Sequence, residues 1–111
     1  MTKTKQIVEL VQLVLVTPAL ADAYLGKSKG NRALKFDVVM ELAKAMREGR
    51  WDPYLTHIRL GHDGQLIDGH HRLHAAYLHG DPLLMVVSRQ LLVESFDGLS
   101  REQAAQVTAS R

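Results

Sequence analysis

The octapeptide LIDGHHRL at residues 66–73 contains the end of a strand, a turn and the start of a helix. Its first two residues are apolar, and the Asp68-Gly69 dipeptide that follows is typical of a turn. A helix is expected over residues 70–79. The apolar face predicted for that helix consists of Leu73, Ala76 and Tyr77. The stretch therefore predicts a strand that runs directly into a helix.

Strands are expected on both sides of this junction. Upstream, residues 56–60 alternate between polar and apolar side chains, as a half-buried strand does. Residues 61–64 (GHDG) have the composition of a hairpin turn, and residues 65–67 form the return strand. Downstream, residues 83–93 are a long run rich in Val and Leu, which predicts a central strand.

The N-terminal half adds a strand and two helices. Residues 5–16 are rich in Val and Leu and favour a strand. Thr17-Pro18 is typical of a helix N-cap followed by proline, and predicts a short helix over residues 18–25. A second helix is expected over residues 36–48. Its apolar stripe, expected to lie in the core, consists of Phe36, Val39, Met40, Ala43 and Met46.

A final helix is expected from Ser100, where Ser-Arg-Glu-Gln resembles a capping box, and its end is expected to fray by residue 111. The expected order of elements is then β-α-α-β-β-α-β-α. This order predicts a small α/β (α+β) fold in which helices flank a mixed sheet. The length of 111 residues is that of a single domain, so we expect one domain over residues 1–111.

Composition narrows the functions that are open to the chain. It contains no cysteine, which excludes disulfides, thiolate chemistry and zinc sites built on sulfur. The net charge of +2 and the pI of about 9.1 permit nucleic-acid or nucleotide partners without demanding them. The apolar run at residues 7–16 is shorter than the roughly 20 residues that span a membrane. A cytoplasmic location without a membrane partner is expected.

The start of the helix at residues 70–79 has the chemistry of an anion site. The first N–H groups of a helix have no partner inside the helix, and the helix dipole adds positive potential there. Gly69 allows the backbone to approach a ligand closely. Arg72 supplies a planar guanidinium suited to phosphate oxygens, and His70 and His71 can donate further hydrogen bonds. Asp-Gly before a helix also occurs for turn and capping reasons alone.

Asp68 has three interpretations: a metal ligand, a base, or a cap of the turn. Beside a nucleotide phosphate it would hold Mg²⁺. Zinc is not expected, although His70 and His74 stand four residues apart on the helix, because the glutamate of a helical zinc-protease motif is missing. The expected cofactor is therefore Mg²⁺ together with a nucleoside di- or triphosphate.

A basic, glycine-containing loop over residues 26–33 is the second candidate element. It is either a solvated loop or a segment that closes over a nucleotide, in which case Asn31 and Arg32 would contact the ligand. Trp51 is expected to anchor the core or its edge rather than to stack on a base.

Four segments together carry a resemblance to a known superfamily. They are NRAL at 31–34, MREGRW at 46–51, IRLGHDG at 58–64 and DGHHRLHA at 68–75. The set resembles small ParB/sulfiredoxin-superfamily proteins of phages and mobile elements, over roughly residues 10–97. Their usual signature is Asn-Arg-Pro-Leu, then Gly-x-Trp after a helix, then Asp-Gly-Gln-His-Arg-Leu before the next helix.

The resemblance implies a nucleotide-phosphate site at the strand-turn-helix element. ParB proteins bind CTP there with a Gly-Glu-Arg-Arg box, and free-serine kinases carry Asp-Gly-His-His-Arg, identical to residues 68–72. By this match, Gly69, His71 and Arg72 would contact phosphate. His70 stands where sulfiredoxins need cysteine, so sulfiredoxin activity is excluded.

Three functions follow as hypotheses. The first is nucleotide binding, whose enzymatic form is a slow phosphohydrolase or phosphotransferase with Asp68 and His70 as candidate catalytic residues. The second is a DNA-associated ParB-like nuclease or regulator of a phage or mobile element. Its basic face would comprise Lys27, Lys29, Arg32, Arg47, Arg50, Arg59 and Arg72. The third is a phage-encoded interaction module without catalysis. The apolar strands also leave an edge at which a homodimer could form.

Overall fold

A computed structural model describes residues 5–28, 33–55 and 57–94 of the chain. Its elements are β1 (Lys5–Val16), α1 (Pro18–Leu25), α2 (Phe36–Arg47), the 3₁₀ turn η1 (Pro53–Leu55), β2 (His57–Leu60), β3 (Leu66–Asp68), α3 (His70–His79) and β4 (Leu83–Glu94). The expected α+β class, a mixed sheet with flanking helices, is confirmed. The helix expected from Ser100 lies outside the described residues, as do Asn31 and Arg32.

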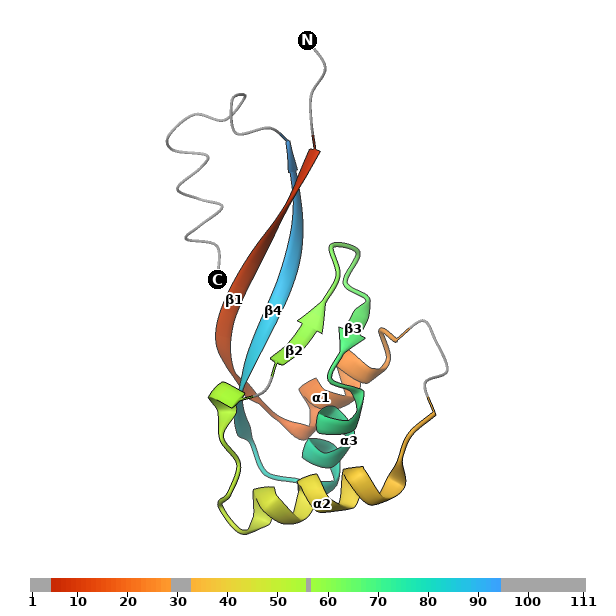
Figure 1. The fold of residues 1–111 in the computed structure, drawn as a ribbon, viewed down its shortest axis with the longest axis vertical. Helices are drawn as coiled ribbons and strands as arrows, with labels where there is room; N and C mark the ends of the chain where they lie inside the picture. The colour runs from red at the N-terminus through yellow and green to blue at the C-terminus, as the bar shows by residue number, and fades with distance from the viewer. Residues whose placement is uncertain (1–4, 29–32, 56, 95–111) are drawn as a thin grey trace.

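The described strands form a four-stranded mixed sheet in the order β1-β4-β2-β3 (Figure 1). β1 and β4 pair antiparallel over twelve residues each, β2 pairs parallel with β4, and β3 returns antiparallel along β2. The strand expected to be central, β4, is indeed flanked on both sides. β2 reaches along β4 only from Val86 to Arg89. Beyond that point β1 and β4 continue as a two-stranded ribbon.

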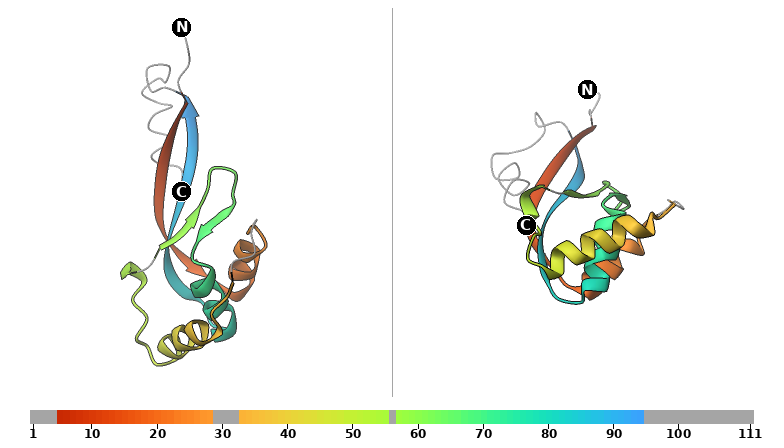
Figure 2. Two further views of the ribbon diagram at one scale, coloured as in Figure 1. Left: turned by 45° about the vertical axis from the view of Figure 1, so that its right-hand side comes forward. Right: turned by 60° about the horizontal axis from the view of Figure 1, so that its bottom comes forward.

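The hydrophobic core lies at the end of the sheet where the three described helices gather. β1, β2, β3 and β4 contribute Val16, Ile58, Leu60, Leu66, Met85 and Val87, and the helices contribute Ala21, Tyr24, Val39, Ala43, Met46, Leu73, Ala75 and Ala76. α3 packs against both α1 and α2, so it is the central helix of this layer (Figure 2). None of the described helices has the length and apolar content that a membrane crossing requires.

Two helical faces differ from their predicted form. In α2 the buried residues are Val39, Ala43 and Met46, whereas Phe36 is 70% exposed and Met40 43% exposed. At 100° per residue, Phe36 and Met40 lie some 60–100° around the helix from the buried stripe, so they face outward. In α3, Tyr77 is likewise exposed. The prediction that Phe36 and Met40 belong to the core was therefore wrong, and Tyr77 does not share the buried side of α3 with Leu73 and Ala76, as its predicted apolar face required.

Several local predictions are confirmed. Thr17 caps α1, because its Oγ1 accepts the N–H of Leu20 at 3.1 Å. Gly64 adopts a φ of +83° in the hairpin between β2 and β3, where the Gly61 N–H donates to the carbonyl of Gln65 at 2.7 Å. Trp51 anchors the edge of the core: its Nε1 donates to the carbonyl of Leu84 at 3.1 Å.

Candidate functional site

The strand-to-helix junction predicted from residues 66–73 is present. β3 ends at Asp68, Gly69 is the N-cap, and α3 begins at His70. The first bond inside the helix runs from the Leu73 N–H to the Gly69 carbonyl at 2.9 Å. Gly69 offers no side-chain cap, and the first turn contains no acidic residue. The positive end of the helix dipole is therefore not offset by a carboxylate in that turn.

Gly69 is required by the fold itself. Its φ of +112° is a conformation that residues with a side chain rarely adopt. A Cβ at this position would also lie 2.5 Å from Cδ1 of Ile58, on the neighbouring strand β2. The sequence suggested that the missing side chain of Gly69 leaves room for a ligand. In the structure, Ile58 occupies that room. The glycine serves the packing of β2 against the junction whether or not a ligand binds.

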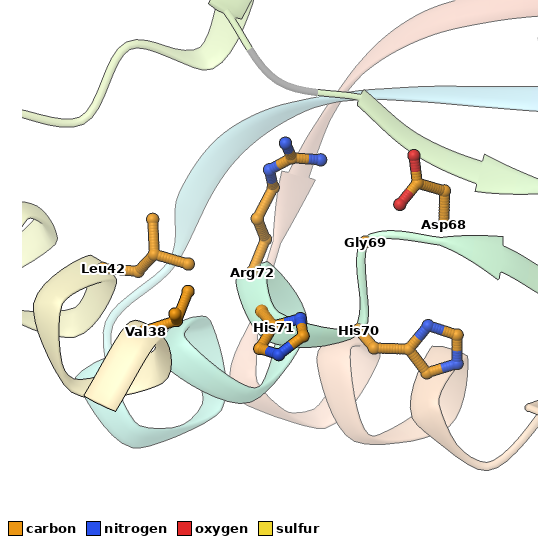
Figure 3. A pocket seen from close by; sticks show the side chains of 7 residues that line it. All are labelled: Val38, Leu42, Asp68, Gly69, His70, His71 and Arg72. Carbon is orange, nitrogen blue, oxygen red and sulfur yellow. The ribbon is translucent and has the colours of Figure 1, made fainter. Parts of the chain in front are cut away.

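A pocket of about 250 Å³ opens at this end of α3. It is lined by Asp68, Gly69, His70, His71 and Arg72, together with Val38 and Leu42 from α2 (Figure 3). The structure therefore brings the five predicted motif residues to one opening. It also adds an apolar wall that the sequence analysis did not assign to the site.

Arg72 reaches from α3 toward the start of β2. Its Nη1 donates to the carbonyl oxygen of His57 at 3.1 Å. A guanidinium has five N–H donors, so this bond leaves others for a ligand. Figure 3 shows Arg72 and Asp68 on the same side of the junction, with the ring of His70 turned away from both. Arg72 is thus both a link between elements and the cation of the pocket.

His71 connects the two helices that border the pocket. Its Nε2 accepts the backbone N–H of Lys35 at 3.1 Å. Lys35 is the N-cap of α2, and its own side chain does not cap that helix. As an acceptor, Nε2 is unprotonated, which leaves Nδ1 as the ring atom that could donate to an anion. The predicted phosphate contact by His71 would have to use that atom.

His70 is buried, with 9% of its surface exposed. A hydrogen bond of 2.7 Å joins its Nε2 to Oγ of Ser28, in the segment that follows α1. A histidine that is hydrogen-bonded to a serine hydroxyl can accept its proton, which is the arrangement of an activated nucleophile. The same bond also satisfies a buried ring nitrogen and ties α1 to α3.

Asp68 is half-buried at the end of β3, opposite Arg59 in the strand ladder. Arg59 makes an ion pair with Glu9, at 3.8 Å between Nε and Oε1. No group of three potential metal ligands occurs among the described residues. A magnesium ion at Asp68 would therefore take its other ligands from phosphate oxygens and water, a common arrangement for this ion.

Five neighbours of the motif are not predictable from the sequence: Ser28, Lys35, Val38, Leu42 and His57. Ser28 and His70 are 42 positions apart, and Lys35 and His71 are 36 apart. No local pattern signals contacts over such separations. The spacing of Val38 and Leu42 by four residues does indicate a shared helical face, although not the pocket that this face borders.

No protein-family model, curated protein or solved structure matches this chain.

Proposed function

We propose that this protein binds the phosphate groups of a nucleotide at the N-terminus of α3, as the resemblance to ParB/sulfiredoxin-like proteins suggests. The observation that carries the proposal is a pocket that joins the N-terminus of α3, whose first turn contains no acidic residue, to the guanidinium of Arg72. Asp68 also lines this pocket, and Mg²⁺ would offset its negative charge beside a phosphate. Backbone N–H groups, the helix dipole and a planar cation are the three features that favour a phosphate.

The size of the pocket limits which part of the ligand it would hold. Small-molecule pockets typically enclose about 300–1,000 Å³, and this one has about 250 Å³. It therefore suits a di- or triphosphate better than an entire nucleotide. The nucleoside would extend out of the pocket, and Val38 and Leu42 offer it an apolar surface beside the phosphates.

Turnover would need a metal and a group that moves a proton. Asp68 would hold Mg²⁺ on the phosphates, and the N-terminus of α3 would stabilise the charge that develops during phosphoryl transfer. His70, hydrogen-bonded to Ser28, would be the proton acceptor, although its ring is turned away from Asp68 and Arg72 and would have to act through Ser28. If these groups turn the nucleotide over, the protein is a slow phosphohydrolase or phosphotransferase. If they do not, it is a module that only binds nucleotide.

Calorimetry with the common nucleoside di- and triphosphates, with and without Mg²⁺, tests this proposal. We expect Arg72→Ala to weaken binding by about ten- to a hundredfold, because a charge-assisted hydrogen bond is worth roughly 1.5–3 kcal/mol. Arg72→Lys keeps the charge but not the planar fork, so it should recover part of the affinity.

Arg50→Ala is the matched control, because Arg50 is an exposed arginine whose ion pair with Glu48 lies outside the lining of the pocket. Arg72 also binds the carbonyl of His57, so urea denaturation must show that each variant remains folded. Nucleotide binding that is equally tight in folded Arg72→Ala and wild type would refute the assignment. Steeply salt-dependent DNA binding without nucleotide binding would favour the DNA hypothesis instead.

A further inference from the structure

β1 forms an edge of the sheet along its whole length. It pairs with β4 on one side, and no described strand pairs with its other side. Such an edge presents N–H and C=O groups that another strand can bind. Proteins commonly protect an edge with proline, a bulge or many charges. β1 contains no proline, its register with β4 is continuous, and its charged residues are Lys5 and Glu9.

The exposed face of β1 is largely apolar. Ile7 is 59% exposed, Val11 54%, Leu13 46% and Leu15 55%. These residues alternate with half-buried ones, so they share the face that points away from the core. Lys5 and Glu9 lie on the same face, on either side of Ile7.

The outer part of the ribbon has little support among the described residues. Residues 5–9 pair with residues 90–94, beyond the point where β2 ends. Figures 1 and 2 show this part extending away from the three helices. The radius of gyration is 16.4 Å, against about 13 Å for a compact domain of this length. An isolated pair of strands is only marginally stable in water, so this ribbon would gain from a partner.

We propose that the partner is a second copy of this chain, whose β1 pairs antiparallel with β1 about a two-fold axis at Ile7. Within β1, residues 5–9 of each copy then pair with residues 5–9 of the other, and Val11, Leu13 and Leu15 lie beyond this pairing. The two sheets then form one continuous sheet. A two-fold axis perpendicular to a sheet must pass through one residue position, and it keeps the same side chains on the same face. Each choice of axis therefore sets a different residue opposite Glu9.

Charge complementarity selects the register. With the axis at Ile7, Lys5 of each copy faces Glu9 of the other, which makes two opposite-charge pairs. An axis at Glu9 would place the two Glu9 carboxylates against each other. Axes at residues 8, 10, 11 or 12 would place Glu9 against Ile7, Val11, Leu13 or Leu15. The axis at Ile7 is the one in this range that pairs both charged residues of β1.

This interface is separate from the phosphate site. β1 and β3 are at opposite edges of the sheet, and the pocket lies at the junction of β3 and α3. Arg59 is the described residue that reaches Glu9, at 3.8 Å, and Lys5 of the second copy would join that carboxylate from the other side. A protein that binds nucleotide but stays monomeric would therefore contradict the dimer alone. A dimer that binds no nucleotide would contradict the phosphate site alone.

Cysteine cross-linking tests the register directly, because the chain contains no cysteine. Ile7→Cys would place two thiols together on the axis, where mild oxidation should give a disulfide-linked dimer on a non-reducing gel. Val11→Cys is the matched control, since Val11 is similarly exposed on the same face. In this register the two thiols introduced by Val11→Cys would be about 25 Å apart, far beyond disulfide range.

Light scattering and a charge swap complete the test. Wild type should show about twice the 12.4 kDa mass of one chain. Lys5→Glu should weaken the dimer by about tenfold, because both charge pairs become repulsive. A chain that carries both Lys5→Glu and Glu9→Lys should regain the dimer. This chain also carries Arg59→Gln, which removes the cation next to residue 9. A monomeric wild type would overturn the dimer. Faster cross-linking at residue 11 than at residue 7, or no rescue by the swap, would overturn the register.

Discussion

At the scale of single residues, hydrogen bonds to three different segments of the chain hold the motif at the start of α3. His70 binds Ser28, His71 accepts from Lys35, and Arg72 donates to His57. These bonds preorganise the side chains around the pocket, which reduces the entropy lost when a ligand binds. They also mean that the stability of a variant must be measured alongside its affinity for nucleotides.

Gly69→Ala should lower the free energy of unfolding by about 3 kcal/mol. This loss adds the cost of holding alanine at a positive φ to the cost of a steric clash. The clash is with Cδ1 of Ile58, so adding Ile58→Val, which removes that atom, should recover part of the loss. Gly49→Ala is the control: Gly49 also has a positive φ, but a Cβ there would meet no atom within 4 Å, so this variant should lose about 1 kcal/mol. Urea denaturation of wild type and the three variants measures these losses. Equal losses at Gly69 and Gly49 would show that the contact with Ile58 is unimportant.

At the scale of elements, α3 is the part that organises the site. It packs between α1 and α2, and its first turn binds the segments next to both. The pocket is consequently bounded by α3 and α2, while the bond between Ser28 and His70 links α3 to the end of α1.

Ser28→Ala tests that link between elements. Removing the hydroxyl takes a hydrogen bond from a buried imidazole, so we expect a loss of about 1–3 kcal/mol in the free energy of unfolding. Ser28→Thr keeps the hydroxyl and should lose less. If the pair also moves a proton, Ser28→Ala should abolish nucleotide turnover while leaving nucleotide affinity unchanged. A variant as stable as wild type would show that the bond does not hold the two helices together.

At the scale of the whole molecule, the fold has a packed end and an extended end. The helices, the end of β1, β2, β3 and the first part of β4 share the core, whereas residues 5–9 and 90–94 form the outer ribbon. This division places the pocket proposed to bind phosphate on the packed end and the proposed dimer interface on the extended one.

Amide hydrogen exchange should reveal this division. At concentrations where the protein is monomeric, amides of residues 5–9 and 90–94 should exchange faster than those of residues 85–88, because no third described strand supports them. Raising the concentration should slow exchange in residues 5–9 if two copies pair there. Uniform protection along β4 in the monomer would contradict this account.

The sequence predicted most elements because their signals are local. Thr17-Pro18 marks the start of α1, alternation marks β2, and Asp68-Gly69 separates β3 from α3. It did not predict which part of an apolar surface would be buried. Phe36 and Met40 are as apolar as their buried neighbours, and the direction from which the adjoining elements pack decides which side of α2 is buried.

By itself, the sequence determined the order of the described α-helices and strands and predicted an anion site at the start of one helix. These depend on turn residues, caps and periodicity, which act over a few positions. The tertiary structure alone decided the strand order, the wall that Val38 and Leu42 add to the pocket, and the partners of His70, His71 and Arg72. It also left β1 at an edge. Such features depend on packing between segments far apart in the chain, for which no local pattern carries a signal.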